Sequence, residues 1–139
     1  MTFIAASTLV VALAAADASP AAVQAVAAAY KGNVERVFNE QCADCHGRPP
    51  ASLAGPALET AKKKSAKAHK KLDMDAGFPF KGRRPLPGML DEVADEVEDG
   101  DMPPKKYLKE KGTTLTPADR KAVVEWARSG AASLAPPAN

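Results

Sequence analysis

The sequence predicts a small all-α domain. Apolar side chains recur at three- and four-residue intervals in several segments, as they do on the buried face of a helix. Loops rich in the chain's 12 prolines and 9 glycines separate these segments, and both residue types interrupt helices. No segment shows the alternation of apolar and polar residues that marks a half-buried strand. With 139 residues, the chain is long enough for one domain and short tails.

The N-terminal segment is apolar and has the length of an export signal's core. Residues 3–16 carry no charge, and Asp17 ends the run. The segment is too short to cross a bilayer comfortably, and its alanines offer a small-residue cleavage site. No basic residue precedes Lys31, so an uncleaved anchor is the alternative to a cleaved signal. The predicted organisation is a signal peptide or anchor at 1–16, an N-terminal spacer helix at 17–32, the domain proper at 33–134 and a tail at 135–139.

Two helices are expected before the first functional motif, with a break between them. Ser19 followed by Pro20 is typical of a helix start, with a capping hydroxyl and a proline in the first turn. Gly32 is predicted to end this spacer helix, and Asn33 is predicted to cap the next one. The second helix has an apolar stripe and reaches Cys42 near its C-terminal end.

Both cysteines of the chain lie in one motif, Cys42-Ala43-Asp44-Cys45-His46. Residues three apart lie on one face of a helical turn, so the two thiols can reach the same flat molecule. This pattern is typical of covalent haem attachment, in which the histidine is an axial ligand of the iron. We therefore predict one haem, bound covalently through Cys42 and Cys45, with His46 on the iron.

Three other uses of this motif fit less well. A thiol redox pair is expected beside a βαβ unit, which the sequence does not indicate. A structural zinc site would need the distant His69 as its fourth ligand, at a spacing that matches known zinc fingers poorly. A disulfide between cysteines three residues apart would close a very small loop and constrain little of the chain.

Three more helices are expected after the motif. A basic helix is predicted at 59–72, where the lysines would form either a solvated face or a docking patch for an acidic partner. An acidic helix is predicted at 89–99, with Gly100 as its terminator. Thr116 and Pro117 have the chemistry of a capped start for the last helix.

The segment 74–88 is long and rich in proline and glycine, so it is predicted to be a loop. Phe78 and Phe80 indicate that this loop packs against the rest of the domain. Arg83 and Arg84 could pair with the haem propionates through bidentate contacts. Two solvated arginines in a loop are an equally good interpretation.

The iron has a second axial position, for which Met102 is the best candidate. Pro103 disfavours helical geometry at Met102, and a second proline stiffens the segment, so little flexibility is lost when the sulfur binds. The alternatives are Met74, Met89, His69 or an open site. Two protein ligands would give an electron carrier, whereas an open position would permit gas binding or peroxide chemistry.

The chain resembles the class I c-type cytochromes, in which an all-α, cytochrome c-like domain wraps around one covalently attached haem. The resemblance rests on the cysteine motif, on Met102 in a later loop and on Trp126 in the closing helix. More narrowly, residues 98–104 followed by Tyr107 resemble the E-x-G-x-M-P-P turn of a bacterial haem-binding-domain subgroup. The resemblance covers about residues 33–130.

A second part of the resemblance concerns the partner of the haem histidine. Gly55-Pro56-x-Leu58 resembles the G-P-x-L segment that those cytochromes carry soon after the histidine. This implies that Pro56 and Leu58 belong to the haem site, with the Pro56 carbonyl accepting the Nδ1 proton of the histidine. Pro49 and Pro50 are alternatives to Pro56 in this role.

The resemblance implies a periplasmic electron-transfer protein with His46 and Met102 on the iron and a redox protein as its partner. The alternative is a haem-based sensor or ligand-binding module with an open or labile sixth site. An enzyme such as a peroxidase has little support, since His69 is the only histidine left to act as a distal acid or base. The formal net charge of +2 does not indicate nucleic acid, and a membrane is expected only with an uncleaved N-terminal segment. Residues 109–113 depart from the subgroup's usual turn, which leaves the partner and the potential open.

Overall fold

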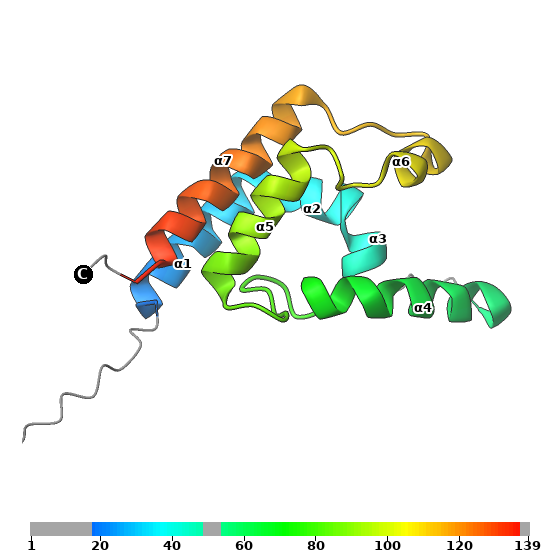
Figure 1. Cartoon of the computed structure of the whole chain (residues 1–139), viewed down its shortest axis with the longest axis horizontal. Coiled ribbons are helices and arrows are strands. Elements are labelled where there is room, and N and C mark those ends of the chain that lie inside the picture. Colours follow the sequence, from blue (N-terminus) through cyan, green and yellow to red (C-terminus); the bar gives the residue numbers. More distant parts are fainter. Residues whose placement is uncertain (1–17, 49–53, 137–139) are drawn as a thin grey trace, which may run out of the picture.

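The computed structural model describes residues 18–48 and 54–136. The order of the elements is α1 (Pro20–Ala29), a π-helical turn (Tyr30–Val34), α2 (Glu35–Gln41), α3 (Ala43–His46), α4 (Gly55–Lys71), α5 (Leu86–Glu98), α6 (Lys105–Lys111) and α7 (Pro117–Leu134) (Figure 1). These two ranges contain no strand, only an isolated antiparallel bridge between Asp73 and Lys81. The all-α prediction is confirmed. The predicted signal peptide or anchor at 1–16 lies outside the described residues.

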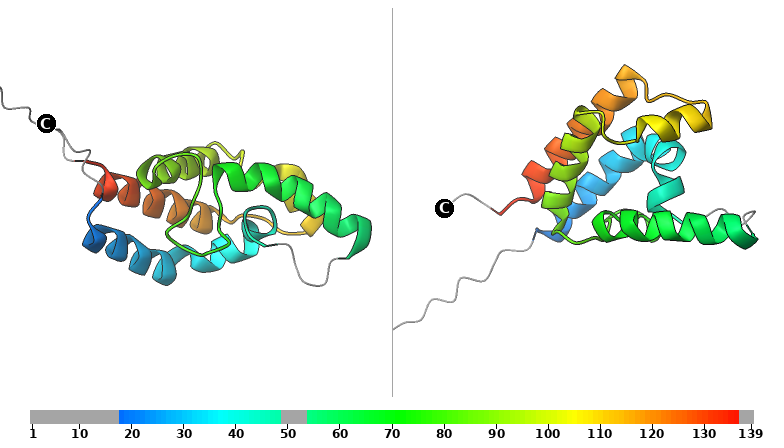
Figure 2. Two further views of the ribbon diagram at one scale, coloured as in Figure 1. Left: turned by 90° about the horizontal axis from the view of Figure 1, so that it is seen from below. Right: turned by 45° about the vertical axis from the view of Figure 1, so that its right-hand side comes forward.

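Helices α1, α5 and α7 lie side by side and form the main body of the domain (Figure 2). They meet at Gly130 of α7, where a Cβ atom would lie 2.9 Å from Leu90 Cδ1 and 3.0 Å from Val26 Cγ1. Both neighbours are buried. Glycine therefore permits a close approach of the three helices. Among the helices described, none combines the length and the apolar character that a membrane span requires.

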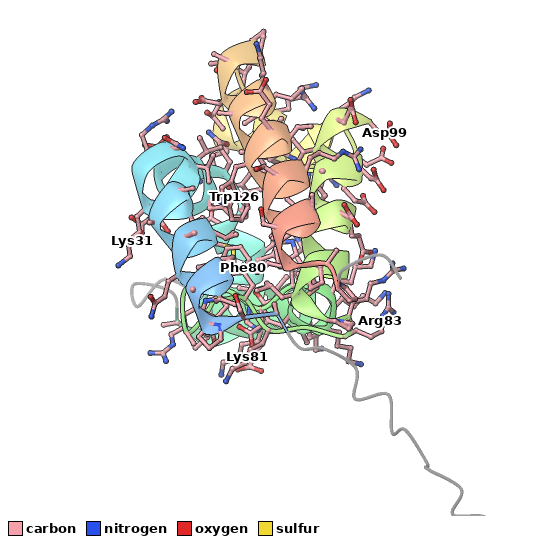
Figure 3. All side chains as sticks on the ribbon, turned by 90° about the vertical axis from the view of Figure 1, so that its left-hand side faces the viewer. Lys31, Phe80, Lys81, Arg83, Asp99 and Trp126 are labelled. Carbon is pink, nitrogen blue, oxygen red and sulfur yellow. The ribbon has the colours of Figure 1, made fainter. Side chains whose placement is uncertain are left out.

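Aromatic rings fill the space beside these helices. The Tyr30 ring centroid lies 5.4 Å from the centroids of Phe38, Phe80 and Trp126, and 5.6 Å from that of Phe78. Each such pair adds about 0.5–1.5 kcal/mol to the stabilisation from buried area. Figure 3 shows Phe80 and Trp126 between the α1–α2 side of the molecule and α7. The prediction that the loop at 74–88 packs against the domain through its two phenylalanines is confirmed.

The segment predicted as a spacer helix at 17–32 is part of this core. Trp126 Nε1 donates a hydrogen bond to the Val26 carbonyl at 3.2 Å, which ties α1 to α7. The predicted break at Gly32 is wrong, because the chain continues through the π-helical turn Tyr30–Val34 into α2. The first and last residues of that turn are both buried, so tertiary packing determines the path here.

The other helices follow the predicted order with shifted boundaries. Helix α4 starts at Gly55, where φ is +57°, and Pro56 lies in its first turn. It therefore begins earlier than the predicted residue 59. Helix α6 was not predicted. The start of α7 is confirmed, since Thr116 Oγ1 accepts a hydrogen bond from the Asp119 amide at 3.0 Å.

Candidate functional site

An apolar cleft lies between α2, α3, α4, α5 and the segment that joins α5 to α6. Its volume is about 310 Å³, at the lower end of the range for small-molecule sites. The walls include Cys42, Cys45, His46 and Met102. The structure therefore brings together the two thiols, the histidine and the methionine that were predicted to share one cofactor. The apolar part of the wall includes Val37, Phe38, Leu72, Val93, Val97 and Leu115.

The end of α2 positions the cysteine motif. The Cys42 amide donates to the Phe38 carbonyl at 2.9 Å as the last hydrogen bond of that helix. The Cys42 carbonyl then accepts from the amides of Cys45 at 3.2 Å and His46 at 3.0 Å, which starts α3. One tight turn thus carries all three side chains into the wall of the cleft. Both cysteines are half-buried and free, so the disulfide alternative is not formed.

The environment of the thiols differs from that of a redox dithiol. Burial raises the pKa of the Cys42 thiol to about 12. Burial also raises the pKa of Cys45, as does the Asp44 carboxylate, while the Lys64 and Lys111 charges oppose the rise. Both thiols are therefore protonated at neutral pH. Thiol redox sites need the reverse, because the thiolate is their reactive form.

The His46 ring is held in one tautomer by a hydrogen bond to the backbone. Its Nδ1 atom donates a hydrogen bond to the Leu72 carbonyl at 2.7 Å. A carbonyl only accepts, so the proton is on Nδ1 and the lone pair of the neutral ring is on Nε2. Burial is the main cause that lowers the pKa of His46, which favours the neutral ring at pH 7. A neutral imidazole held in this way is the form that serves as an iron ligand.

The resemblance implied that the Pro56 carbonyl accepts the Nδ1 proton of His46, and that assignment is wrong, because Leu72 supplies the carbonyl. Pro56 is exposed in the first turn of α4, where its carbonyl accepts a hydrogen bond from Thr60 Oγ1 at 3.0 Å. The physical reason is that the carbonyls of a helix point along its axis toward residues four positions further on. Leu58 is also absent from the walls of the cleft. Pro49 and Pro50, the alternatives, lie outside the described residues.

Met102 is half-buried in the wall of the cleft, in the turn between α5 and α6. Its amide and that of Asp101 both donate to the Glu96 carbonyl at 2.9 Å. Gly100 has a φ of +78°, a left-handed conformation that ends α5 at little steric cost. The backbone of the methionine is thus fixed to the end of a core helix.

The other candidates for the second axial position are less well placed. Met89 reaches the wall of the cleft, but its Sδ atom packs against Gly82, where a Cβ atom would lie 2.5 Å away. Met74 is buried in the core and does not line the cleft. His69 is outside the cleft as well, and its Nε2 donates to the Gly47 carbonyl at 3.0 Å. The four ligands of the zinc alternative are therefore not brought together.

Arg83 and Arg84 are exposed and do not line the cleft, which agrees with the interpretation of two solvated arginines and not with contacts to the haem propionates. Figure 3 shows Arg83 at the outer edge of the molecule. The Nε atom of Arg84 pairs with Glu92 Oε2 at 3.4 Å. The cationic residues of the wall come instead from α4, and they are Lys64, Lys67 and Lys71.

A polar network holds α6 against the cysteine motif. The Tyr107 hydroxyl donates to Asp44 Oδ2 at 2.9 Å, and Lys111 Nζ donates to the same oxygen at 3.0 Å. Lys111 also donates to the Tyr107 oxygen at 2.8 Å and to the Glu40 carbonyl at 2.6 Å. Asp44 lies between the two cysteines in sequence, and Tyr107 lines the cleft. Sequence reasoning noted Tyr107 only through the resemblance, although its four-residue spacing to Lys111 is a local signal of a helix.

The residues of the cleft fit a haem. Two thiols lie in one turn, a neutral histidine offers Nε2, a thioether lies in the same cleft, and the remaining wall is largely apolar. A model of the haem-binding-domain family matches residues 2–129. No match was found among curated proteins or among solved structures. Because the family model spans most of the sequence, the chain belongs to the haem-binding-domain family.

Proposed function

We propose that this protein is a monohaem c-type cytochrome that carries electrons, with His46 and Met102 as the iron ligands. One observation carries the proposal: the two thiols, the imidazole and the thioether all line a single, largely apolar cleft. When bound, the haem would supply the reversible one-electron chemistry of its iron. Residues of the chain would anchor the haem, bind its iron and exclude water from it.

Each donor residue has a distinct task in this proposal. Cys42 and Cys45 anchor the macrocycle through thioether bonds. His46 binds the iron through Nε2, and the Leu72 carbonyl keeps the ring in one orientation and one tautomer. The thioether of Met102 favours the reduced iron, so we expect a reduction potential above that of a bis-histidine haem. The apolar walls keep water from the iron and maintain this preference.

The same ligation makes an electron carrier a better proposal than an enzyme. With His46 and Met102 both bound to it, the iron would have no open position for peroxide or another substrate. His69, the one histidine that could act as a distal acid or base, does not line the cleft. We propose an exported, periplasmic protein, since the resemblance places haem attachment outside the cytoplasm and residues 1–16 have the composition of a signal peptide core. Its partner would be another redox protein.

Absorption spectroscopy of protein made in a host that matures c-type haem tests the proposal. The spectra of the oxidised and reduced forms would be recorded for the wild type, for Met102→Ala and for Met89→Leu. We expect a low-spin ferric wild type with a weak sulfur-to-iron charge-transfer band in the far red. Met102→Ala should lose the band, and Met89→Leu should keep it. The opposite pattern would assign the second axial position to Met89, and a high-spin wild type would contradict methionine ligation.

A mass measurement of the denatured protein tests the covalent attachment separately. The wild type should retain the mass of one haem after unfolding, because thioether bonds survive denaturation. The Cys42→Ala/Cys45→Ala double variant should release any haem that it binds. Loss of haem from the unfolded wild type would contradict the proposed c-type attachment and would leave the family's haem binding untouched.

A sensor or ligand-binding module is the second candidate. Its support is the partial exposure of Met102, because a change of side-chain rotamer could move the sulfur away from the iron while the backbone stays held at the end of α5. Carbon monoxide added to the reduced protein at neutral pH separates the two candidates. Ready binding by the wild type would favour the sensor. Binding by Met102→Ala but not by the wild type would favour the electron carrier.

A further inference from the structure

Three lysines form one wall of the cleft. Lys64, Lys67 and Lys71 follow one another at intervals of three and four residues, so they lie on a single face of α4. The same helix carries three other lysines that do not line the cleft, and these are Lys62, Lys63 and Lys70. Helix α4 therefore presents a cationic face to the site and a separate cationic surface elsewhere.

A second wall of the cleft carries the opposite charge. Glu92 and Glu96 line it from α5. Arg84 offsets the first of these charges through its contact at 3.4 Å, while Tyr107 contributes the phenol of α6 to the wall. An otherwise apolar cleft thus has one cationic and one anionic side. A flat ligand with carboxylates along one edge is most stable when that edge faces α4.

We propose that Lys64, Lys67 and Lys71 bind the carboxylate groups of the haem and direct its polar edge toward α4. This inference rests on the proposed function, because it requires a haem in the cleft. It gives α4 a role in the site that the two arginines at 83 and 84 were predicted to have. The ammonium groups stabilise the ionised carboxylates and neutralise charge that would otherwise oppose reduction of the iron.

Two triple variants of the same helix provide the test. K64Q/K67Q/K71Q removes the three charges of the wall, and K62Q/K63Q/K70Q removes three charges from the same helix outside the cleft. Both lose three positive charges and keep residues that favour helices. The measurement is the reduction potential of the haem-bearing protein as a function of pH, at about 0.1 M salt, where separations beyond about 10 Å are largely screened.

We expect the wall variant to show haem carboxylates that ionise about one pH unit higher than in the wild type, together with a lower potential at neutral pH. The control variant should follow the wild-type curve. K64R/K67R/K71R keeps the charge and should restore the wild-type ionisation. Equal shifts in the wall and control variants, or no shift in either, would overturn the assignment of the lysines. A wild type without haem would instead overturn the proposed function, so the two failures are distinguishable.

Discussion

The close contact of α1, α5 and α7 at Gly130 predicts how Gly130→Ala changes the free energy of unfolding, through a gain in helix propensity and a loss from overpacking. Gly130→Ala adds a Cβ atom that would meet Leu90 Cδ1 at 2.9 Å and Val26 Cγ1 at 3.0 Å. Leu90 is 0% and Val26 6% exposed, so neither side chain has room to move aside. Gly32→Ala is a matched control, because Gly32 is also helical and a Cβ atom there meets nothing within 4 Å.

The magnitudes decide the sign of each change. Alanine is about 0.5–1 kcal/mol more favourable than glycine inside a helix. Overpacking a well-filled core costs about 1–3 kcal/mol. At Gly130 both terms apply, and we expect a net loss of about 1–2 kcal/mol in the free energy of unfolding. At Gly32 only the first term applies, so we expect a gain of up to about 1 kcal/mol.

Denaturant unfolding of the haem-bearing protein, followed by circular dichroism, measures both values. One kcal/mol corresponds to a shift of about 4 °C in Tm for a domain of this size, so thermal scans give an independent check. If Gly130→Ala proved as stable as Gly32→Ala, the three helices would not be in the close contact described, and the reasoning would be refuted.

Two further predictions concern a buried phenol and a helix cap. Burial raises the pKa of Tyr30 to about 12. Near pH 10 only the phenol of the unfolded chain ionises. The contribution of Tyr30 to the free energy of unfolding is therefore complete below pH 10 and falls by up to about 3 kcal/mol as the pH rises to about 12. The unfolding free energy of the wild type relative to Tyr30→Phe should therefore fall across this range, and a constant difference would contradict the burial. Thr116→Ala removes the side-chain cap of α7 and should cost about 1 kcal/mol in the same unfolding assay. Thr114→Ala, an exposed neighbour, should change little, and equal losses in both variants would argue against the cap.

Local chemistry accounts for the parts of the fold that the sequence predicted well. The caps at Ser19 and Thr116 both accept hydrogen bonds from the first turn of their helices, as their spacing indicated. The cysteine motif is equally local, since five consecutive residues contain both cysteines and His46. The prediction of a helix break at Gly32 was wrong because glycine lowers helix propensity by only about 1 kcal/mol. Burial of the neighbouring Tyr30 in an aromatic cluster outweighs that term.

The parts of the site that were missed depend on distant residues. The carbonyl that holds His46 belongs to Leu72, 26 positions away, and no side-chain pattern marks a backbone acceptor. Arginine chemistry favoured Arg83 and Arg84 as carboxylate partners. Which cations reach the cleft is set by the direction of α4 and of the loop after it, which spacing within a helix does not reveal. Helix α6 was missed because its seven residues contain few apolar side chains.

The hydrogen bond from Trp126 to Val26 has a consequence for the order of events during folding. The two residues are 100 positions apart, so this contact closes a long loop of the chain. The turn that carries Cys42, Cys45 and His46 needs only local contacts, whereas the aromatic core that shapes one end of the cleft cannot close until α7 docks against α1. We therefore expect the two thiols to be accessible before the core closes. Under the proposed function, that interval is when a haem could enter the cleft.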